Sequence, residues 1–283
     1  GLLFGLLPLP QQLRSPLQQL VRDGRGSADR DRQRVRKTLI VAQIALALVL
    51  LTGSMLMLRS FQRLRSVDPG FNPNGVLTLG VSAGDGVSRV EATARYQRIA
   101  EEAAALPGVT HVGLINALPL DPEGMNGGSF ELESRPRAEG ELPSVAYYSA
   151  ISPGYFEAIG TPLLQGRPME RADIEERRPV VWVSETFARD FLGGEAIGER
   201  VRFDTVSDWL EIVGVVRDVR TFGLREPIRP MVYVPMTEPI GTMQVSAMTL
   251  VLRTSGDPAG LAPAARAAVQ RADPTIPITT MTM

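Results

Sequence analysis

Few residues of this chain could do nucleophilic or metal chemistry. Its 283 residues contain one histidine, His111, and one lysine, Lys37, and no cysteine. A single histidine without cysteine excludes H-E-x-x-H and every zinc site built from several histidines or cysteines. Any Ser-His-Asp catalytic triad would have to use His111, which lies inside the predicted strand VTHVGLI. Because Arg36 precedes Lys37, the phosphate-binding G-x-x-x-x-G-K-[ST] loop is absent, and we expect no ATP hydrolysis by this chain.

Carboxylates remain as candidate catalytic groups, in a membrane-anchored hydrolase. Asp204, Glu211 and Asp218 each lie near the edge of a predicted strand and among arginines. Side chains in such places more often form solvated ion pairs. We therefore predict no enzymatic activity, no catalytic, cofactor-binding or metal-binding residue, and no cofactor.

The longest apolar stretch is Leu39–Leu58, LIVAQIALALVLLTGSMLML, which carries no charge. Twenty residues at about 1.5 Å each cross a hydrocarbon core of roughly 30 Å, so the stretch predicts a transmembrane helix. A signal peptide is the alternative, but its apolar region is shorter, about 7–15 residues. Residues 1–9, GLLFGLLPL, are interpreted as the end of a preceding transmembrane helix, and residues 10–38 as a basic linker.

A basic cluster before the span predicts its orientation. Eight basic residues and three acids lie between positions 14 and 37. Because cytoplasmic loops carry the Lys/Arg excess, residues 10–38 are expected in the cytoplasm and residues 59–283 in the periplasm of a bacterial inner membrane. The net charge of the whole chain is −1, so no nucleic-acid partner is expected. The basic residues are Arg14, Arg22, Arg25, Arg30, Arg32, Arg34, Arg36 and Lys37.

Residues 59–75 predict a stalk that leaves the membrane. Their first part continues the helix as an amphipathic segment, and two turn signals follow, Asp68-Pro69-Gly70 and Asn72-Pro73-Asn74-Gly75. We interpret Asp68–Gly75 as a hinge about which the exported domain moves as a unit.

Residues 76–116 read as a β-α-β unit. Val76–Ser82 and Val109–Ile115 predict strands, and a helix begins after the N-cap Ser88 and ends near Leu106.

Residues 246–283 repeat this order. Met248–Arg253 predicts a strand, Asp257-Pro258 begins a helix, and a further strand runs through Ile276 and Ile278. Pro263 is expected to delay or kink that helix. Because either unit alone would bury too little apolar surface, we expect the two halves to pair as one split, porter-like subdomain.

Residues 117–245 predict an inserted, mainly β lobe, so the fold class is membrane-anchored α+β. Residues 119–128 and 135–142 are expected to be loops, and two short helices follow Pro153 and Ser184. The predicted strands are Ser144–Ile151, Pro179–Val183, Arg200–Phe203, Leu210–Val216 and Met231–Pro235.

Four segments together resemble the periplasmic core domain of MacB/FtsX-type ABC transporter permeases. They are LRSFQRLRSVDPGFNPNGVLTL, ISPGYFEAIGTPLLQGRPM, VVWVSETFARDFLGGEAIGERVRF and EIVGVVRDVRTFGLREPIRPMVYVP. The resemblance runs from about Pro8 to the end of the chain. It implies the second half of a duplicated permease, of which this chain is expected to be a fragment that lacks the returning transmembrane helices.

The resemblance implies a non-catalytic permease subunit, engaged in export or in mechanotransmission. Its expected partners are a separate cytoplasmic ABC ATPase, the remaining transmembrane helices of the permease and, as a further candidate, a periplasmic adaptor. The alternative from another functional class is a single-span periplasmic sensor or binding module.

Overall fold

The computed structural model describes residues 28–65, 67–84, 86–121, 125–138, 140–203, 208–238, 240, 243 and 245–281. It divides into two compact units, Gly1–Arg65 and Ser66–Met283. The predicted helix end at residues 1–9 and the linker up to residue 27 lie outside the described residues.

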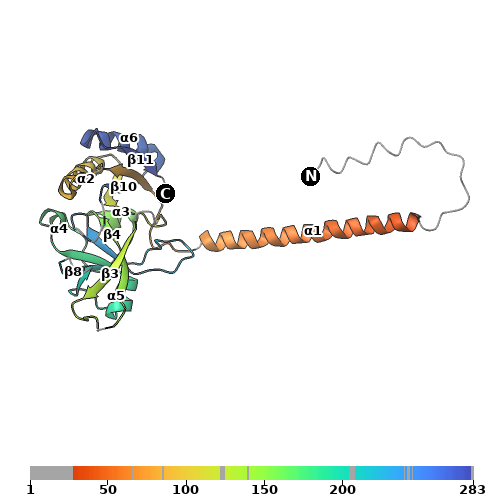
Figure 1. Cartoon of the computed structure of the whole chain (residues 1–283). Helices are drawn as coiled ribbons and strands as arrows, with labels where there is room; N and C mark the ends of the chain where they lie inside the picture. Colours follow the sequence, from red (N-terminus) through yellow and green to blue (C-terminus); the bar gives the residue numbers. More distant parts are fainter. Residues whose placement is uncertain are drawn as a thin grey trace, which may run out of the picture. The chain divides into compact units, whose positions relative to one another are not determined.

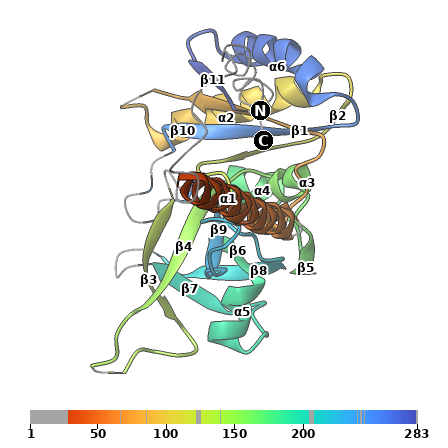
Figure 2. The same cartoon turned by 90° about the vertical axis from the view of Figure 1, so that its right-hand side faces the viewer.

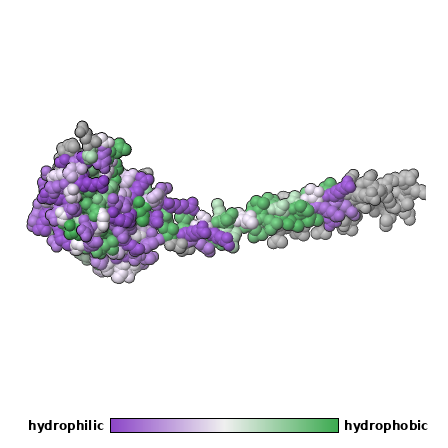
Figure 3. Space-filling view, turned by 90° about the horizontal axis from the view of Figure 1, so that it is seen from below, coloured by the Kyte–Doolittle hydropathy of each residue, from purple (hydrophilic) through white to green (hydrophobic). Residues whose placement is uncertain are grey.

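The described part of the first unit is one helix, α1 (Ala28–Arg65) (Figure 1). It contains the predicted span, and its segment Gln33–Leu64 is long and apolar enough to cross a membrane, judged by length and composition. Large apolar side chains along it are exposed, among them Leu39, Leu50 and Leu56. Figure 3 shows this apolar stretch of α1 in green. A helix that is apolar on all sides needs an apolar environment, which a bilayer provides.

The second unit begins with β1 (Val76–Ser82), α2 (Arg89–Ala104) and β2 (Val109–Ile115). Both strands have the predicted bounds. Ser88 caps α2 as expected, because its Oγ accepts a hydrogen bond from the N–H of Glu91 at 3.2 Å. The buried face of α2 consists of Ala92, Thr93, Tyr96, Ile99 and Ala103.

The chain ends with β10 (Ala247–Thr254), α6 (Pro258–Ala272) and β11 (Ile278–Met281). These strands join the first ones in the order β11-β1-β10-β2, and every pair is antiparallel. Helices α2 and α6 lie together on one side of these strands, and α3 (Tyr155–Ile159) lies on the other (Figures 1 and 2). Because β10 inserts between β1 and β2, segments more than 130 residues apart share one ladder.

Six strands between these segments close into a ring. Their order is β4-β3-β7-β8-β6-β9, and β9 pairs back with β4 in parallel. Closure gives each of the six strands a neighbour on both sides. Trp182, Phe203 and Leu210 are among the fully buried side chains of these strands. The strands are β3 (Asn126–Leu132), β4 (Ser144–Ile151), β6 (Val180–Ser184), β7 (Arg200–Phe203), β8 (Leu210–Val216) and β9 (Met231–Pro235).

Three smaller elements complete the second unit. Strand β5 (Leu163–Gly166) pairs with β8, α4 (Arg171–Glu175) precedes β6, and α5 (Glu185–Leu192) follows it. Ser184 caps α5 through a 3.3 Å hydrogen bond from the N–H of Phe187 to its Oγ.

The structure corrects several predicted elements. The loop expected at residues 119–128 overlaps β3, which begins at Asn126 with two glycines. A Cβ at Gly127 would lie 3.1 Å from the ring of Tyr147 in β4. The absence of a side chain at Gly127 therefore leaves room for that ring. Strand β5 and helix α4 were not predicted. Helix α6 begins at Pro258, so Pro263 does not delay its start, and the last strand begins at Ile278, after Ile276.

Candidate functional site

The segment that follows α1 is bonded to the rest of the second unit. Asp68 forms an ion pair with Arg217, with 2.7 Å between Oδ2 and Nη2. The carbonyl oxygen of Pro69 accepts a hydrogen bond from the N–H of Arg220 at 2.9 Å. Both contacts fix the segment to the stretch that follows β8.

Gly70 is required by this close approach. Its φ is +84°, and a Cβ there would lie 1.9 Å from the carbonyl oxygen of Asp218. Only glycine combines this backbone angle with this contact. The carbonyl oxygen of Gly70 also accepts a 3.3 Å hydrogen bond from the hydroxyl of Thr161.

Arg253, near the end of β10, gathers four main-chain carbonyls around its guanidinium. Its Nε donates to the oxygens of Ala158 and Glu157 at 2.9 and 3.2 Å, at the end of α3. Its Nη1 donates to Asn74 at 3.0 Å and its Nη2 to Asn72 at 2.9 Å. Burial lowers the pKa of Arg253. The planar fork of arginine suits this arrangement, which a single ammonium could not reproduce.

Two main-chain bonds complete the attachment. The N–H of Asn72 donates to the carbonyl of Ile159 at 3.0 Å, and the N–H of Thr254 donates to the carbonyl of Gly75 at 2.8 Å. Residues 68–75 are thus held by partners from three separate parts of the second unit. The contacts do not agree with the predicted hinge at Asp68–Gly75, because a hinge needs a segment that is free to change its backbone angles.

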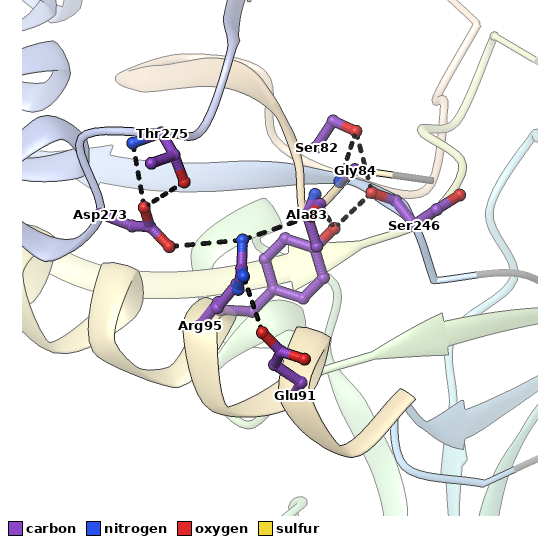
Figure 4. A network of polar contacts seen from close by, with 9 residues as sticks. Ser82, Ala83, Gly84, Glu91, Arg95, Ser246, Asp273 and Thr275 are labelled. Carbon is purple, nitrogen blue, oxygen red and sulfur yellow. Dashed lines mark hydrogen bonds and ion pairs between the residues drawn. The ribbon is translucent and has the colours of Figure 1, made fainter. Parts of the chain in front are cut away.

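A second polar network joins the two β-α-β segments (Figure 4). Arg95 of α2 bonds Glu91 at 2.7 Å, lies 3.6 Å from a carboxylate oxygen of Asp273, and donates to the carbonyl of Ala83 at 3.4 Å. The hydrogen bond from Arg95 to Glu91, together with nearby acidic groups, raises the pKa of Arg95. Hydrogen bonds from Thr275 and the charge of Arg95 lower the pKa of Asp273.

Tyr96 belongs to the same network and is fully buried. Its hydroxyl donates to the carbonyl of Ser246 at 2.8 Å and accepts the N–H of Ala83 at 3.0 Å. Burial raises the pKa of Tyr96 to about 12, so the hydroxyl stays protonated at neutral pH. One phenol therefore satisfies a donor and an acceptor from opposite ends of the domain sequence.

The stretch Gly80–Gly84, GVSAG, fits the G-x-S-x-G pattern but has none of its geometry. In hydrolases this serine occupies a strained turn beside a histidine. Ser82 instead pairs with Ala247 in the ladder of β1 and β10, and its φ is not positive. Its hydroxyl donates to the carbonyl of Ser246 at 3.1 Å. His111 lies exposed on β2, with its Nδ1 3.3 Å from the Thr110 hydroxyl.

Among the described residues, the structure does not bring the three candidate carboxylates together into a catalytic site. Asp218 caps the first turn of α5, accepting the N–H and the hydroxyl of Thr186 at 2.8 and 2.6 Å. Glu211 is exposed on β8. The pKa of Arg167 is raised mainly by its hydrogen bond to Asp173, and the charge of Glu211 adds a smaller contribution. Asp204 lies outside the described residues. In the part of the chain that the structure describes, no three His, Asp or Glu side chains are placed to hold a metal ion.

Sequence reasoning missed Arg253 and Tyr96 as connecting residues. Both stand in predicted elements, a strand and the buried face of a helix. Nothing local marks the carbonyls that they bond, which lie 95 to 181 residues away along the chain. An arginine that ends an otherwise apolar strand was the available signal for Arg253.

Comparison with known families gives one match that covers most of the chain. The model of the MacB-like periplasmic core domain matches residues 38–271. No curated protein matches the chain.

Several solved structures are similar at low identity. The periplasmic region of MacB from Actinobacillus actinomycetemcomitans is 15% identical, with 77% of this chain and 94% of that one covered and a TM-score of 0.48. A domain of a putative permease protein from Porphyromonas gingivalis is 18% identical, with 75% and 93% covered and a TM-score of 0.45. The extracellular domain of the transporter YknZ from Gram-positive bacteria is 16% identical, with 73% and 99% covered and a TM-score of 0.44.

Proposed function

Because the chain belongs to the family of the MacB-like periplasmic core domain, we propose that it is a non-catalytic permease subunit of an ABC transporter. The family match over residues 38–271 carries this proposal. The apolar helix α1, which begins before the matched region and passes into it, supports it. A separate cytoplasmic ATPase would supply the energy, since this chain has no phosphate-binding loop.

The proposed location is the bacterial inner membrane. Residues 39–58 would cross the bilayer, residues 10–38 would lie in the cytoplasm and residues 59–283 in the periplasm. The basic residues that precede the apolar stretch support this direction.

We further propose that residues 76–116 and 246–283 form one split, porter-like subdomain and that residues 117–245 form an inserted lobe. The ladder order β11-β1-β10-β2 supports the first part, and the closed ring of β4-β3-β7-β8-β6-β9 supports the second. The stalk of residues 59–75 would connect the membrane span to both.

The proposed role in coupling rests on how residues 68–75 are attached. Motion that reaches the periplasm through α1 would enter this segment along the chain. Arg253, which bonds Asn72 and Asn74, would pass it into β10, and Asp68 would pass it to the region of Arg217. Anchoring both ends of the segment makes the domain follow the stalk as one body.

A flexible insertion tests the proposed coupling. The full chain with Leu142→Cys, an exposed position, is labelled with a donor dye and placed with its ATPase in nanodiscs that contain acceptor lipid. ATP should change the energy transfer between dye and lipid. A long Gly/Ser insertion between Arg65 and Asp68 should abolish this change while ATP hydrolysis continues. An insertion of the same length at the exposed loop around Arg135 is the control and should keep the change.

The alternative is a single-span periplasmic sensor or binding module. It predicts no ATP-dependent change in energy transfer with any ATPase encoded beside the chain. An ATP-dependent change that persists after the insertion between Arg65 and Asp68 would instead contradict the relay through residues 68–75. The neighbouring coding sequence separates the two readings independently, because a permease needs further transmembrane segments downstream.

A further inference from the structure

A pocket of about 290 Å³ opens along the edge of β2. Four successive residues of the strand, 109–112, line it. Neighbouring side chains of a strand point to opposite faces, so a pocket on one face would be lined by alternate residues only. Contact with four in succession places the pocket at the edge of the strand, where the main chain is within reach.

The main chain of β2 has a strand partner on one side only along this stretch. Among the described strands, β10 pairs with it from Val109 onward, whereas β4 pairs with it only at Ile115. Leu114 uses the outer edge, since its N–H donates to the Ser152 hydroxyl at 2.9 Å and its carbonyl accepts the Ser152 N–H at 3.0 Å. Alternate residues present their main-chain groups to the same edge, so the N–H of Val112 and the carbonyl of Thr110 point outward there.

The free stretch is short and centred on His111. At one end, Gly154 covers the carbonyl of Val112, because a Cβ at Gly154 would lie 2.3 Å from that oxygen. At the other end a bulge shifts the pairing with β10 between Arg253 and Thr254. Of the usual protections of a strand edge, the described part of β2 has this bulge, but its sequence contains neither a lysine nor a proline.

The pocket beside this edge is apolar inside and charged at its rim. Ala100 and Ala104 of α2 form one wall, and the buried Met236 lies at its floor. Arg171 of α4 forms an ion pair with Glu101 of α2 across the rim.

We propose that the edge of β2 binds an extended segment of a partner polypeptide, which adds a short strand and inserts one apolar side chain into the pocket. Main-chain pairing would give the affinity and the pocket the preference for an apolar residue, as in other cases of strand addition. A small apolar molecule could fill the pocket but would leave the main-chain groups of Thr110 and Val112 without partners. This proposal is independent of the transporter role.

The test uses defined peptides with the full chain in nanodiscs. The probe is the fluorescein-labelled peptide STKTLTKTS, with leucine as the apolar residue. The matched probes are STKTDTKTS and the leucine peptide with N-methylated main-chain amides at alternate positions. Fluorescence anisotropy should show binding of the leucine peptide. The affinity of the chain for each of the other two peptides should be lower by about tenfold or more.

Two variants locate the site on the chain. Val112→Pro removes the outward N–H, and its ring lies on the side away from β10. Ala104→Glu puts a carboxylate into the apolar wall and covers the case in which the proline variant fails to fold. Each should weaken binding about tenfold or more, and Leu142→Glu, at an exposed apolar residue outside the pocket, should not.

The outcomes decide the matter in either direction. If the N-methylated peptide binds as well as the leucine peptide, the leucine side chain alone accounts for binding and strand addition is wrong. Failure of the leucine peptide to bind, or binding that Ala104→Glu leaves unchanged, overturns the proposal as well. Hydrogen exchange at the Val112 amide should slow when the peptide is bound.

Discussion

Arg253 donates from its Nη2 to the carbonyl oxygen of Asn72 at 2.9 Å, across 181 positions of the chain. The bond ties the end of β10 to the segment that follows α1. The proposed coupling depends on this bond, because a covalent link alone would not fix the direction in which the domain moves.

Replacing Arg253 should loosen this connection. Arg253→Ala removes four hydrogen bonds from a charged donor, and we expect a loss of about 2 kcal/mol in the free energy of unfolding. Arg253→Lys should recover only part of it, because an ammonium cannot span carbonyls on both sides of a guanidinium fork. Urea titration measures the loss, and hydrogen exchange at Asn72 and Thr254 locates it.

The control for this pair is Arg271→Ala. Arg271 bonds Glu102 at 3.1 Å on the surface, so its loss should cost about 0.2–1 kcal/mol. Equal losses in the free energy of unfolding for Arg253→Ala and Arg271→Ala would show that the hydrogen bonds of Arg253 stabilise the domain no more than a surface ion pair does.

Asp173 should be among the most sensitive charged residues. It is fully buried and receives both Nη atoms of Arg167 at 2.7 Å and the N–H of Glu170 at 2.8 Å. Asp173→Ala would leave the Arg167 guanidinium without this partner, at an expected cost of about 3 kcal/mol. The exposed pair of Arg171 and Glu175 is the control, and Glu175→Gln should cost about 0.5 kcal/mol or less.

The same carboxylate predicts a dependence on acid. Burial by itself raises the pKa of Asp173, but the bonds from Arg167 and Glu170 outweigh it, and the pKa is lowered. The stabilisation is therefore present above the unfolded pKa of about 3.9 and is lost as pH falls through the folded pKa. Thermal melts from neutral pH to about pH 3 should show a smaller acid-induced loss in Asp173→Ala than in the parent chain.

Tyr96→Phe should be destabilising although it removes one atom only. It leaves the N–H of Ala83 and the carbonyl of Ser246 without their partner, at a cost of about 1–3 kcal/mol. Because burial raises the pKa of Tyr96 to about 12, its stabilisation is complete below about pH 10 and is lost as pH rises toward the folded value. The free energy of unfolding, measured by urea titration, should fall more steeply with rising alkaline pH for the parent chain than for Tyr96→Phe. Equal slopes for the two proteins would contradict this prediction.

The orientation of the chain can be read with single cysteines, since the sequence has none. We expect Ser134→Cys to react with an impermeant maleimide once the outer membrane is permeabilised, and Ser27→Cys to react only after the inner membrane is opened. The reverse pattern would place the second unit in the cytoplasm. The physical reason for the expected result is the excess of basic residues before the apolar stretch.

Local patterns in the sequence specified many elements to the residue. Strands β1, β2, β4, β7, β8 and β9 were predicted from short apolar runs between turn signals, with the bounds observed. Ser88 and Ser184 were recognised as caps because a cap bonds an N–H three positions away. The apolar stretch of α1 was equally plain, since twenty uncharged residues need no partner to be recognised.

Only the tertiary structure decided how these elements are joined. Gly127 and Gly128 favour a loop by composition, yet they lie at the start of β3. They do so because β3 pairs with β4 there and the ring of Tyr147 packs against Gly127. The hinge interpretation of residues 68–75 rested on proline and glycine, whereas Gly70 is there because the carbonyl of Asp218 lies against it. Caps, turns and periodicities are contacts between near neighbours, which a sequence displays. The partners of Arg253 and the free edge of β2 depend on which distant segments meet, and no local pattern records that.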